Sequence, residues 1–179
     1  MFASGTTDST VLGIDTGLTR CGYAVVVSSG AAVRALALGV IRTPPTDALP
    51  QRLAQLQAEL AALIAEYRPD SVAVEQVFFQ VNVRTAMSVG QASGLALAEA
   101  AAAGCEVAQY TPNQVKDAVA GYGGAGKAQV QKMVQARLGL VAPPSPPDAA
   151  DAAALALCHL AMAPMRRRVA AAVARGGVR

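Results

Sequence analysis

The sequence is poor in cysteine, in aromatic side chains and in long apolar runs. Its three cysteines, Cys21, Cys105 and Cys158, lie far apart without paired spacing, which favours reduced thiols over a disulfide framework or a zinc site. The most apolar helical stretch, residues 85–103, contains two serines, a glutamine and Glu99, which argues against a membrane span. These absences exclude a disulfide-stapled secreted domain and an integral membrane protein.

The ends of the chain differ in composition from its middle. The first ten residues are small and polar, with neither the basic start nor the apolar core of a signal peptide, so we expect a cytoplasmic protein. We interpret residues 1–10 as a flexible N-terminus and residues 11–164 as one domain. Residues 165–179 contain five arginines and no acid, and we expect them to form a disordered basic tail.

The apolar pattern predicts an α/β fold. Hydrophobic residues make up 53% of the chain and aromatic ones 4%, with alanine dominant, which favours closely packed helices around a modest sheet. Strands are predicted over residues 11–15, 22–27, 33–42, 71–78 and 106–110. Helices are predicted over residues 53–68, 85–103, 111–120 and 127–138 and from residue 146 onward. The helix before the fourth strand implies a crossover, so that strand should lie parallel to the first in a mixed, five-stranded sheet.

Asp15 ends the first predicted strand, between Gly13 and Gly17. A carboxylate beside a core needs a cation, a hydrogen-bond network or a catalytic role. Gly13 permits close backbone packing and Gly17 permits a turn with positive φ, so the acid should lie at the edge of the sheet. Considered by itself, this segment fits a turn-forming aspartate equally well.

Three further acids change that balance. Glu75 lies toward the end of the fourth strand, and Asp148 and Asp151 lie three apart on one face of the last helix, near the positive end of its dipole. The four acids have no obvious local basic partners, and the topology can bring them to one end of the sheet. Clustered carboxylates require hard divalent cations, and oxygen-only ligands select magnesium or manganese over zinc. Two such ions about 4 Å apart are the standard device for in-line displacement at phosphorus.

The charge balance indicates the substrate. Setting four of the 12 acidic residues aside leaves eight, against 15 basic residues, in a chain with a pI of about 9.0. Metal-neutralised acids in basic surroundings suit a polyphosphate backbone.

Five motifs, in this order, resemble those of the RuvC family of Holliday-junction resolvases. They occupy residues 13–17, 73–78, 114–116, 127–131 and 148–152, and the likeness extends from about residue 11 to residue 163. The resemblance implies an RNase H-like fold and a homodimer that uses magnesium or manganese. It also implies paired nicks in a four-way DNA junction that leave ligatable ends, in DNA recombination and repair, together with the branch-migration proteins RuvA and RuvB.

The same resemblance implies roles for individual residues. The metal-holding catalytic acids would be Asp15, Glu75, Asp148 and Asp151. Lys116 and Lys127 would act near the scissile phosphate, and Phe78 would stack on a base at the junction centre. Because consecutive strand residues face opposite ways, either Phe78 or its neighbour Phe79 could contact DNA.

Other positions complete the sequence-based hypothesis. Arg84 is expected to contact backbone phosphate, and His159, inside an apolar helix, is interpreted as a structural residue. Thr16 stands where family members commonly have proline, and some members have histidine at the position of Asp148. Small residues recur four apart at Gly90, Gly94 and Ala98, a face that permits close helix contact within the core or across a dimer.

Three alternatives use the same features. The string Asp15-Thr16-Gly17 is also the signature of aspartic proteases, but their fold is nearly all strand and would leave the other three acids unexplained. A sugar-kinase-like or actin-like ATPase has a similar turn but needs a second nucleotide-binding domain. A non-catalytic junction-binding protein would have no need of all four acids.

Overall fold

The computed structural model describes residues 8–76 and 83–176. Its strands are β1 (Ser9–Asp15), β2 (Arg20–Ser29), β3 (Ala32–Arg42), β4 (Ser71–Glu75) and β5 (Glu106–Tyr110). Its helices are α1 (Leu49–Tyr67), α2 (Val83–Ala102), α3 (Pro112–Ala120), α4 (Lys127–Arg137) and α5 (Pro147–Gly176). The predicted elements are therefore present in the predicted order.

The strands form one mixed sheet in the order β3-β2-β1-β4-β5. Short turns join β1, β2 and β3, which pair antiparallel, whereas β4 pairs parallel to β1 and β5 pairs parallel to β4. The crossover through α1 produces the predicted parallel pairing of β1 with β4. The carboxyl ends of β1 and β4 consequently lie at the same edge of the sheet.

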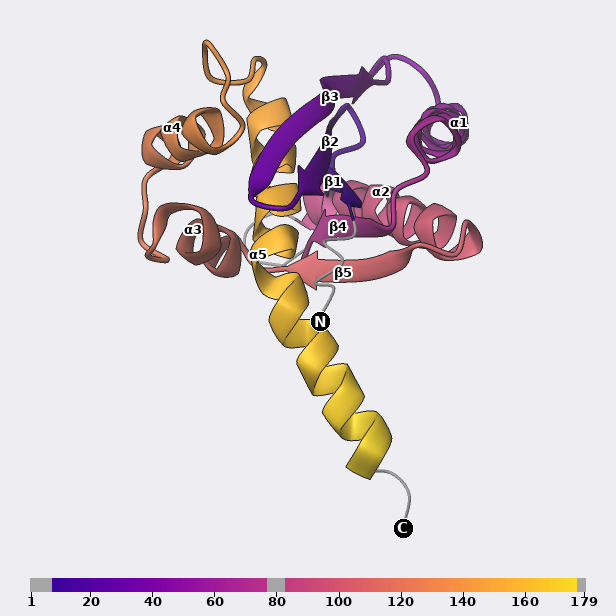
Figure 1. The fold of residues 1–179 in the computed structure, drawn as a ribbon. Coiled ribbons are helices and arrows are strands. Elements are labelled where there is room, and N and C mark those ends of the chain that lie inside the picture. The colour runs from indigo at the N-terminus through magenta and orange to yellow at the C-terminus, as the bar shows by residue number, and fades with distance from the viewer. Residues whose placement is uncertain (1–7, 77–82, 177–179) are drawn as a thin grey trace, which may run out of the picture.

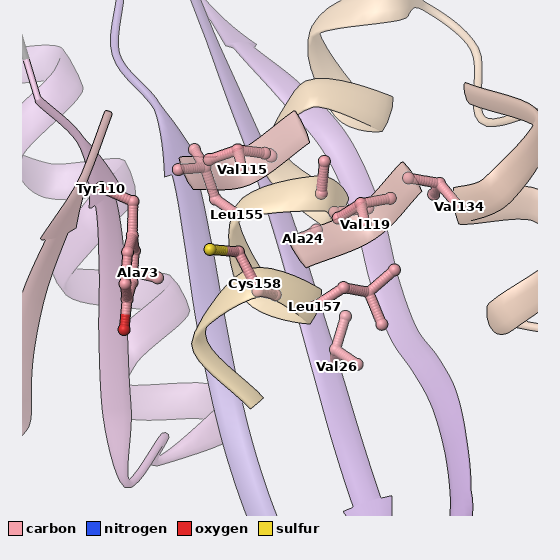
Figure 2. Packing of buried hydrophobic residues seen from close by; sticks show 14 of the residues in the cluster. Ala24, Val26, Ala73, Tyr110, Val115, Val119, Val134, Leu155, Leu157 and Cys158 are labelled. Carbon is pink, nitrogen blue, oxygen red and sulfur yellow. The ribbon is translucent and has the colours of Figure 1, made fainter. Parts of the chain in front are cut away.

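Helices cover both faces of the sheet (Figure 1). Along β1, Leu12 and Ile14 pack in the core under α1 and α2, whereas Val11 belongs to the core under α5. This alternation follows from the two-residue period of a strand. Figure 2 shows the second core, in which residues of α3, α4 and α5 pack against side chains of the central strands. By the same alternation, Asp15 and Glu75 face the α5 side.

Helix α5 packs against the sheet through its backbone. A Cβ atom at Gly13 would collide with the carbonyl oxygen of Ala152, and one at Gly22 would collide with that of Asp148. Apart from the half-buried Asp151, residues 149–158 of the helix are buried, and most of them are alanines with small side chains. Glycine on the strands and alanine on the helix thus allow a close approach, as predicted for Gly13.

The C-terminal segment differs from its prediction. Residues 165–176, expected to be disordered, continue α5 beyond Pro164, and Figure 1 shows this part projecting past the sheet. An internal proline removes one helix hydrogen bond, but alanine and arginine, which dominate the segment, are strong helix formers. The Arg166 side chain also reaches Glu106 at the start of β5, at 3.4 Å.

Several boundaries are also displaced; for example, α1 begins at Leu49 where residue 53 was expected, and β4 ends at Glu75 where residue 78 was expected. β1 begins at Ser9, inside the segment expected to be flexible, and α5 begins at Pro147 where a start at Pro146 was expected. The early start of β1 has a visible cause, because the backbone N–H of Thr10 donates to the Asp70 carboxylate at 2.8 Å. Within the two described ranges, no helix has the length and apolar character needed to cross a membrane.

Candidate active site

Asp15 and Glu75 occupy equivalent places at the ends of two parallel strands. Ile14 of β1 is in register with Val74 of β4, so the residues that follow them are neighbours. The Asp15 carboxyl donates a hydrogen bond to Glu75. These two hydrogen-bonded acids lie side by side at one edge of the sheet, in the candidate site.

Burial and mutual repulsion disfavour the charged forms of both acids. Burial, followed by the nearby charges of Glu75, Asp151 and Asp148, raises the pKa of Asp15 to about 7. Burial and then the charge of Asp151 also raise the pKa of Glu75. The same causes show that all four predicted acids are close enough to interact, as the sequence pattern indicated.

The first two turns of α5 supply the other two acids. Gly22, the cross-strand partner of Asp15, lies under the backbone of Asp148, and Gly13 lies under Ala152. The missing side chains bring the helix close enough for Asp148 and Asp151 to reach the edge of the sheet. The position of these carboxylates therefore depends on main-chain packing as well as on the acids themselves.

Both α5 acids have basic partners that are distant in sequence. Arg20 at the start of β2 binds both oxygens of Asp148, with its closest contact at 2.5 Å. This hydrogen bond holds the pKa of Asp148 below its usual range. The Lys127 ammonium donates to Asp151 at 2.6 Å, and that bond raises the pKa of Lys127. Both acids therefore have basic partners, which the sequence did not indicate because the partners are distant in the chain.

A cavity of about 350 Å³ opens beside these residues. Asp15, Glu75 and Asp151 line it together with Lys116 of α3 and Lys127 of α4, and small or apolar side chains form the rest of the wall. Asp148 is outside this lining and is paired with Arg20. Three of the four predicted acids and both predicted lysines therefore face one cavity.

The donor set suits a hard divalent cation, although the side chains are not closed around one. Among the residues that the structure describes, no three acidic, histidine or cysteine side chains are grouped tightly enough to hold a metal as they stand. Carboxylate oxygen is nevertheless the donor that magnesium and manganese prefer, and burial together with the repulsion of the neighbouring acids raises the pKa of Asp15. A cation would relieve that repulsion, so the residues fit the predicted metal.

Phe78, predicted to stack on a base, and its neighbour Phe79 lie outside the described residues, so the structure does not place them. The backbone of Arg84 lies in the first turn of α2, and its side chain is likewise outside the description.

His159 has the structural surroundings that the sequence suggested. It is buried, its Nδ1 lies 2.9 Å from the Tyr110 hydroxyl, and the two rings meet edge to face. Burial also raises the pKa of Tyr110 to about 12. This pair joins α5 to β5 within the core.

The turn after Asp15 corrects one expectation and leaves one residue unexplained. Gly17 does not adopt a positive φ; a Cβ there would instead collide with the carbonyl oxygen of Arg20, so space explains the glycine. Thr16 is 7% exposed, and its hydroxyl finds no hydrogen-bond partner in the described part of the chain. Nothing in the structure explains why threonine occupies this position.

Arg20 is the residue that sequence reasoning missed. It follows Asp15 by five positions and is the first basic residue after the motif, a signal that could have placed it beside the acids. Its partner is 128 residues away, and only the packing of α5 on β2 brings the two together. Non-local pairs of this kind do not leave a periodic trace in a sequence.

The family model for the crossover junction endodeoxyribonuclease RuvC matches residues 11–159. The chain belongs to the RuvC family. A RuvC from Salinispora arenicola is 54% identical over 166 residues, covering 92% of this chain and 95% of that protein. The Thermus thermophilus RuvC in complex with a Holliday junction substrate is 40% identical, with a TM-score of 0.83 over 88% of this chain and 96% of that one.

A more distant structure supports the fold alone. The yeast mitochondrial Holliday junction resolvase Ydc2 is 15% identical, with a TM-score of 0.65, over 89% of this chain and 82% of that one. The predicted RNase H-like architecture is therefore confirmed. Membership of the RuvC family excludes the protease and ATPase alternatives, and the mixed sheet with helices on both faces is not the nearly all-strand fold of an aspartic protease.

The raised pKa of Asp15 predicts how stability varies with pH in metal-free protein. The folded chain keeps this proton to about pH 7, whereas the unfolded chain loses it near 3.8, so the folded state binds more protons between these values. Stability from this group therefore falls as pH rises through that window. We expect the Tm in EDTA to fall about 5 °C more from pH 5 to pH 8 in the wild type than in Asp15→Asn. Parallel Tm curves for the two proteins would contradict the assignment of the titration to Asp15.

Proposed function

We propose that this chain is a Holliday junction resolvase that makes paired, symmetric nicks in four-way DNA junctions during recombination and repair. The observation that carries the proposal is the cavity at the ends of β1 and β4, where Asp15, Glu75 and Asp151 meet Lys116 and Lys127. Carboxylates that can bind divalent cations, next to lysines that can bind a phosphate, are the groups that metal-dependent phosphodiester hydrolysis requires.

Asp15, Glu75, Asp148 and Asp151 would hold two Mg²⁺ or Mn²⁺ ions. Such ions supply an activated water and neutralise the charge that develops on the phosphate during in-line displacement. Asp15 would be the central ligand of this set, because it lies on the central strand and interacts with all three other acids. Asp148 must turn from Arg20 to join this set.

The two lysines have separate tasks in the proposal. Lys127 begins α4, where the helix dipole disfavours a cation, and its bond to Asp151 compensates for that position. Lys116 lines the cavity from α3 and faces the place where a scissile phosphate would lie. Phe78 would stack on an unpaired base at the junction centre, and Arg84 would contact the backbone nearby.

Symmetric nicking requires two sites, which supports a homodimer. A Cβ atom at Gly90 or at Gly94 of α2 would meet nothing within 4 Å in this single chain, so this face has room for a partner helix. We therefore propose a dimer through α2. Cooperation with RuvA and RuvB and a cytoplasmic location complete the proposal, by analogy with the family.

The test uses a synthetic four-way junction, a plain duplex of the same sequence and a peptide substrate, each with and without Mg²⁺ or Mn²⁺. We expect symmetric nicks in the junction, only when the metal is present, and an intact duplex and peptide. Equal cleavage of duplex and junction would indicate a general nuclease. Cleavage of the peptide would contradict the proposed chemistry altogether.

A further inference from the structure

Arg20 hydrogen-bonds both carboxylate oxygens of Asp148, one of the four acids of the proposed metal site. Its Nε lies 3.2 and 3.4 Å from the two Asp148 oxygens, and a terminal nitrogen lies 2.5 Å from Oδ2. The side chains of Arg20 and Asp148 are 37% and 25% exposed. Both carboxylate oxygens are thus engaged by one guanidinium, and both side chains are partly exposed.

The turn that precedes Arg20 is held in place by hydrogen bonds from Thr43 and Arg52. The buried Thr43 hydroxyl donates to the carbonyl oxygen of Leu18 at 2.6 Å, and the Thr43 N–H donates to the carbonyl oxygen of Thr19 at 3.3 Å. Arg52 of α1 then donates to the hydroxyls of Thr19, at 2.7 Å, and of Thr43, at 3.0 Å. Arg20 therefore starts from a fixed backbone position, unlike an ordinary surface arginine.

This contact directs the Asp148 carboxylate toward Arg20, although its charge still acts on Asp15. Asp15, Glu75 and Asp151 line the cavity, whereas Asp148 is outside its lining. A carboxylate whose two oxygens accept hydrogen bonds from arginine has its best lone pairs occupied, so a cation must compete for them. We infer that Arg20 is a positioning residue that acts as the counter-ion of Asp148 in metal-free protein and gives up this carboxylate when a divalent ion is bound.

The inference rests on the metal site proposed above and adds Arg20 as a residue that competes with the metal ion for Asp148. Removing Arg20 should therefore strengthen metal binding, because the competitor is gone. A merely structural role, in which Arg20 aims Asp148 at the metal, predicts the opposite sign. The direction of the change in metal affinity distinguishes the two roles.

The experiment is titration of metal-free, full-length protein with Mn²⁺ by calorimetry, without DNA, so that cleavage does not enter the measurement. We expect Arg20→Gln to tighten Mn²⁺ binding about threefold to tenfold. Arg42→Gln is the matched control, since Arg42 is the exposed cross-strand partner of Arg20 on β3 and removes the same charge. It should change the affinity less than twofold. Arg20→Lys, which keeps the charge without the fork of two donors, should lie between wild type and Arg20→Gln.

A second variant tests the route of the effect. In an Asp148→Asn background, Arg20→Gln should leave Mn²⁺ affinity unchanged, because the competed carboxylate is absent. Equal tightening by Arg42→Gln would reduce the effect to general charge and overturn the inference. Unchanged or weaker binding by Arg20→Gln, in folded protein and with normal wild-type binding, would overturn it while leaving the metal site standing. Wild-type protein that binds no Mn²⁺ would overturn both.

Discussion

Asp15→Asn should bind a four-way junction as tightly as the wild type, within about twofold, while losing at least about a thousandfold in cleavage. The loss follows from the place of Asp15, which interacts with all three other acids and would be a central ligand of the proposed metal site. Binding should persist because contacts to phosphates dominate junction affinity and the lysines are untouched. The fold should persist too, since an asparagine amide can still donate to Glu75.

This result is measured by gel mobility shift in EDTA and by nicking of a labelled junction in Mg²⁺. Glu59→Gln is a suitable control, because Glu59 is exposed on α1 and its loss removes one negative charge on the other face of the sheet. That control should cleave at the wild-type rate. Asp15→Asn protein that still nicks junctions in Mg²⁺ would remove Asp15 from the catalytic set.

Gly22→Ala should reduce cleavage about a hundredfold, although the new side chain is a single methyl group. The added Cβ would collide with the carbonyl oxygen of Asp148 and approach the Asp148 side chain, so the first turn of α5 must move outward. Both α5 acids move with it. Overpacking of this kind also costs about 1–3 kcal/mol of folding free energy.

A stability-matched control separates displacement from unfolding. Cys21→Ala, at the neighbouring position, loses packing in the core on the opposite face of the sheet and should cost about 1 kcal/mol. It leaves α5 in place, so its junction cleavage should stay within a few fold of wild type at a temperature where both variants are folded. If Cys21→Ala and Gly22→Ala lose activity in parallel with their Tm, the packing of α5 does not set the position of the acids.

Local patterns in the sequence predict most of the fold and the four acids of the site. Asp15 and Glu75 end apolar strands, and Asp148 and Asp151 lie in the first turns of a helix; each feature depends on a few neighbouring residues, so it is visible without a structure. Parallel pairing of β1 with β4 then brings the strand acids to one edge, as topology rules predict.

Features that depend on contacts between distant segments were not visible. The ion pair of Arg20 with Asp148 joins residues 128 positions apart, and the reason for Gly17 is the nearby carbonyl oxygen of Arg20 rather than a positive φ. The extent of α5 was underestimated for a different reason. The arginine-rich composition predicts a disordered tail from residue 165, whereas the alanine- and arginine-rich sequence after Pro164 continues the helix.

The two glycines under α5 also fix its register. Sliding an α-helix by one residue turns its side chains by about 100°, which would direct Ala149 and Ala152 to the places of the two aspartates. Gly13 receives the carbonyl of Ala152, and Gly22 receives that of Asp148, so the helix is seated at two points along its axis and has one depth and one rotation available. A helix rich in similar alanines could otherwise pack on the sheet in several registers. The close contacts at Gly13 and Gly22 select the register that places the acids at the active-site end of the sheet.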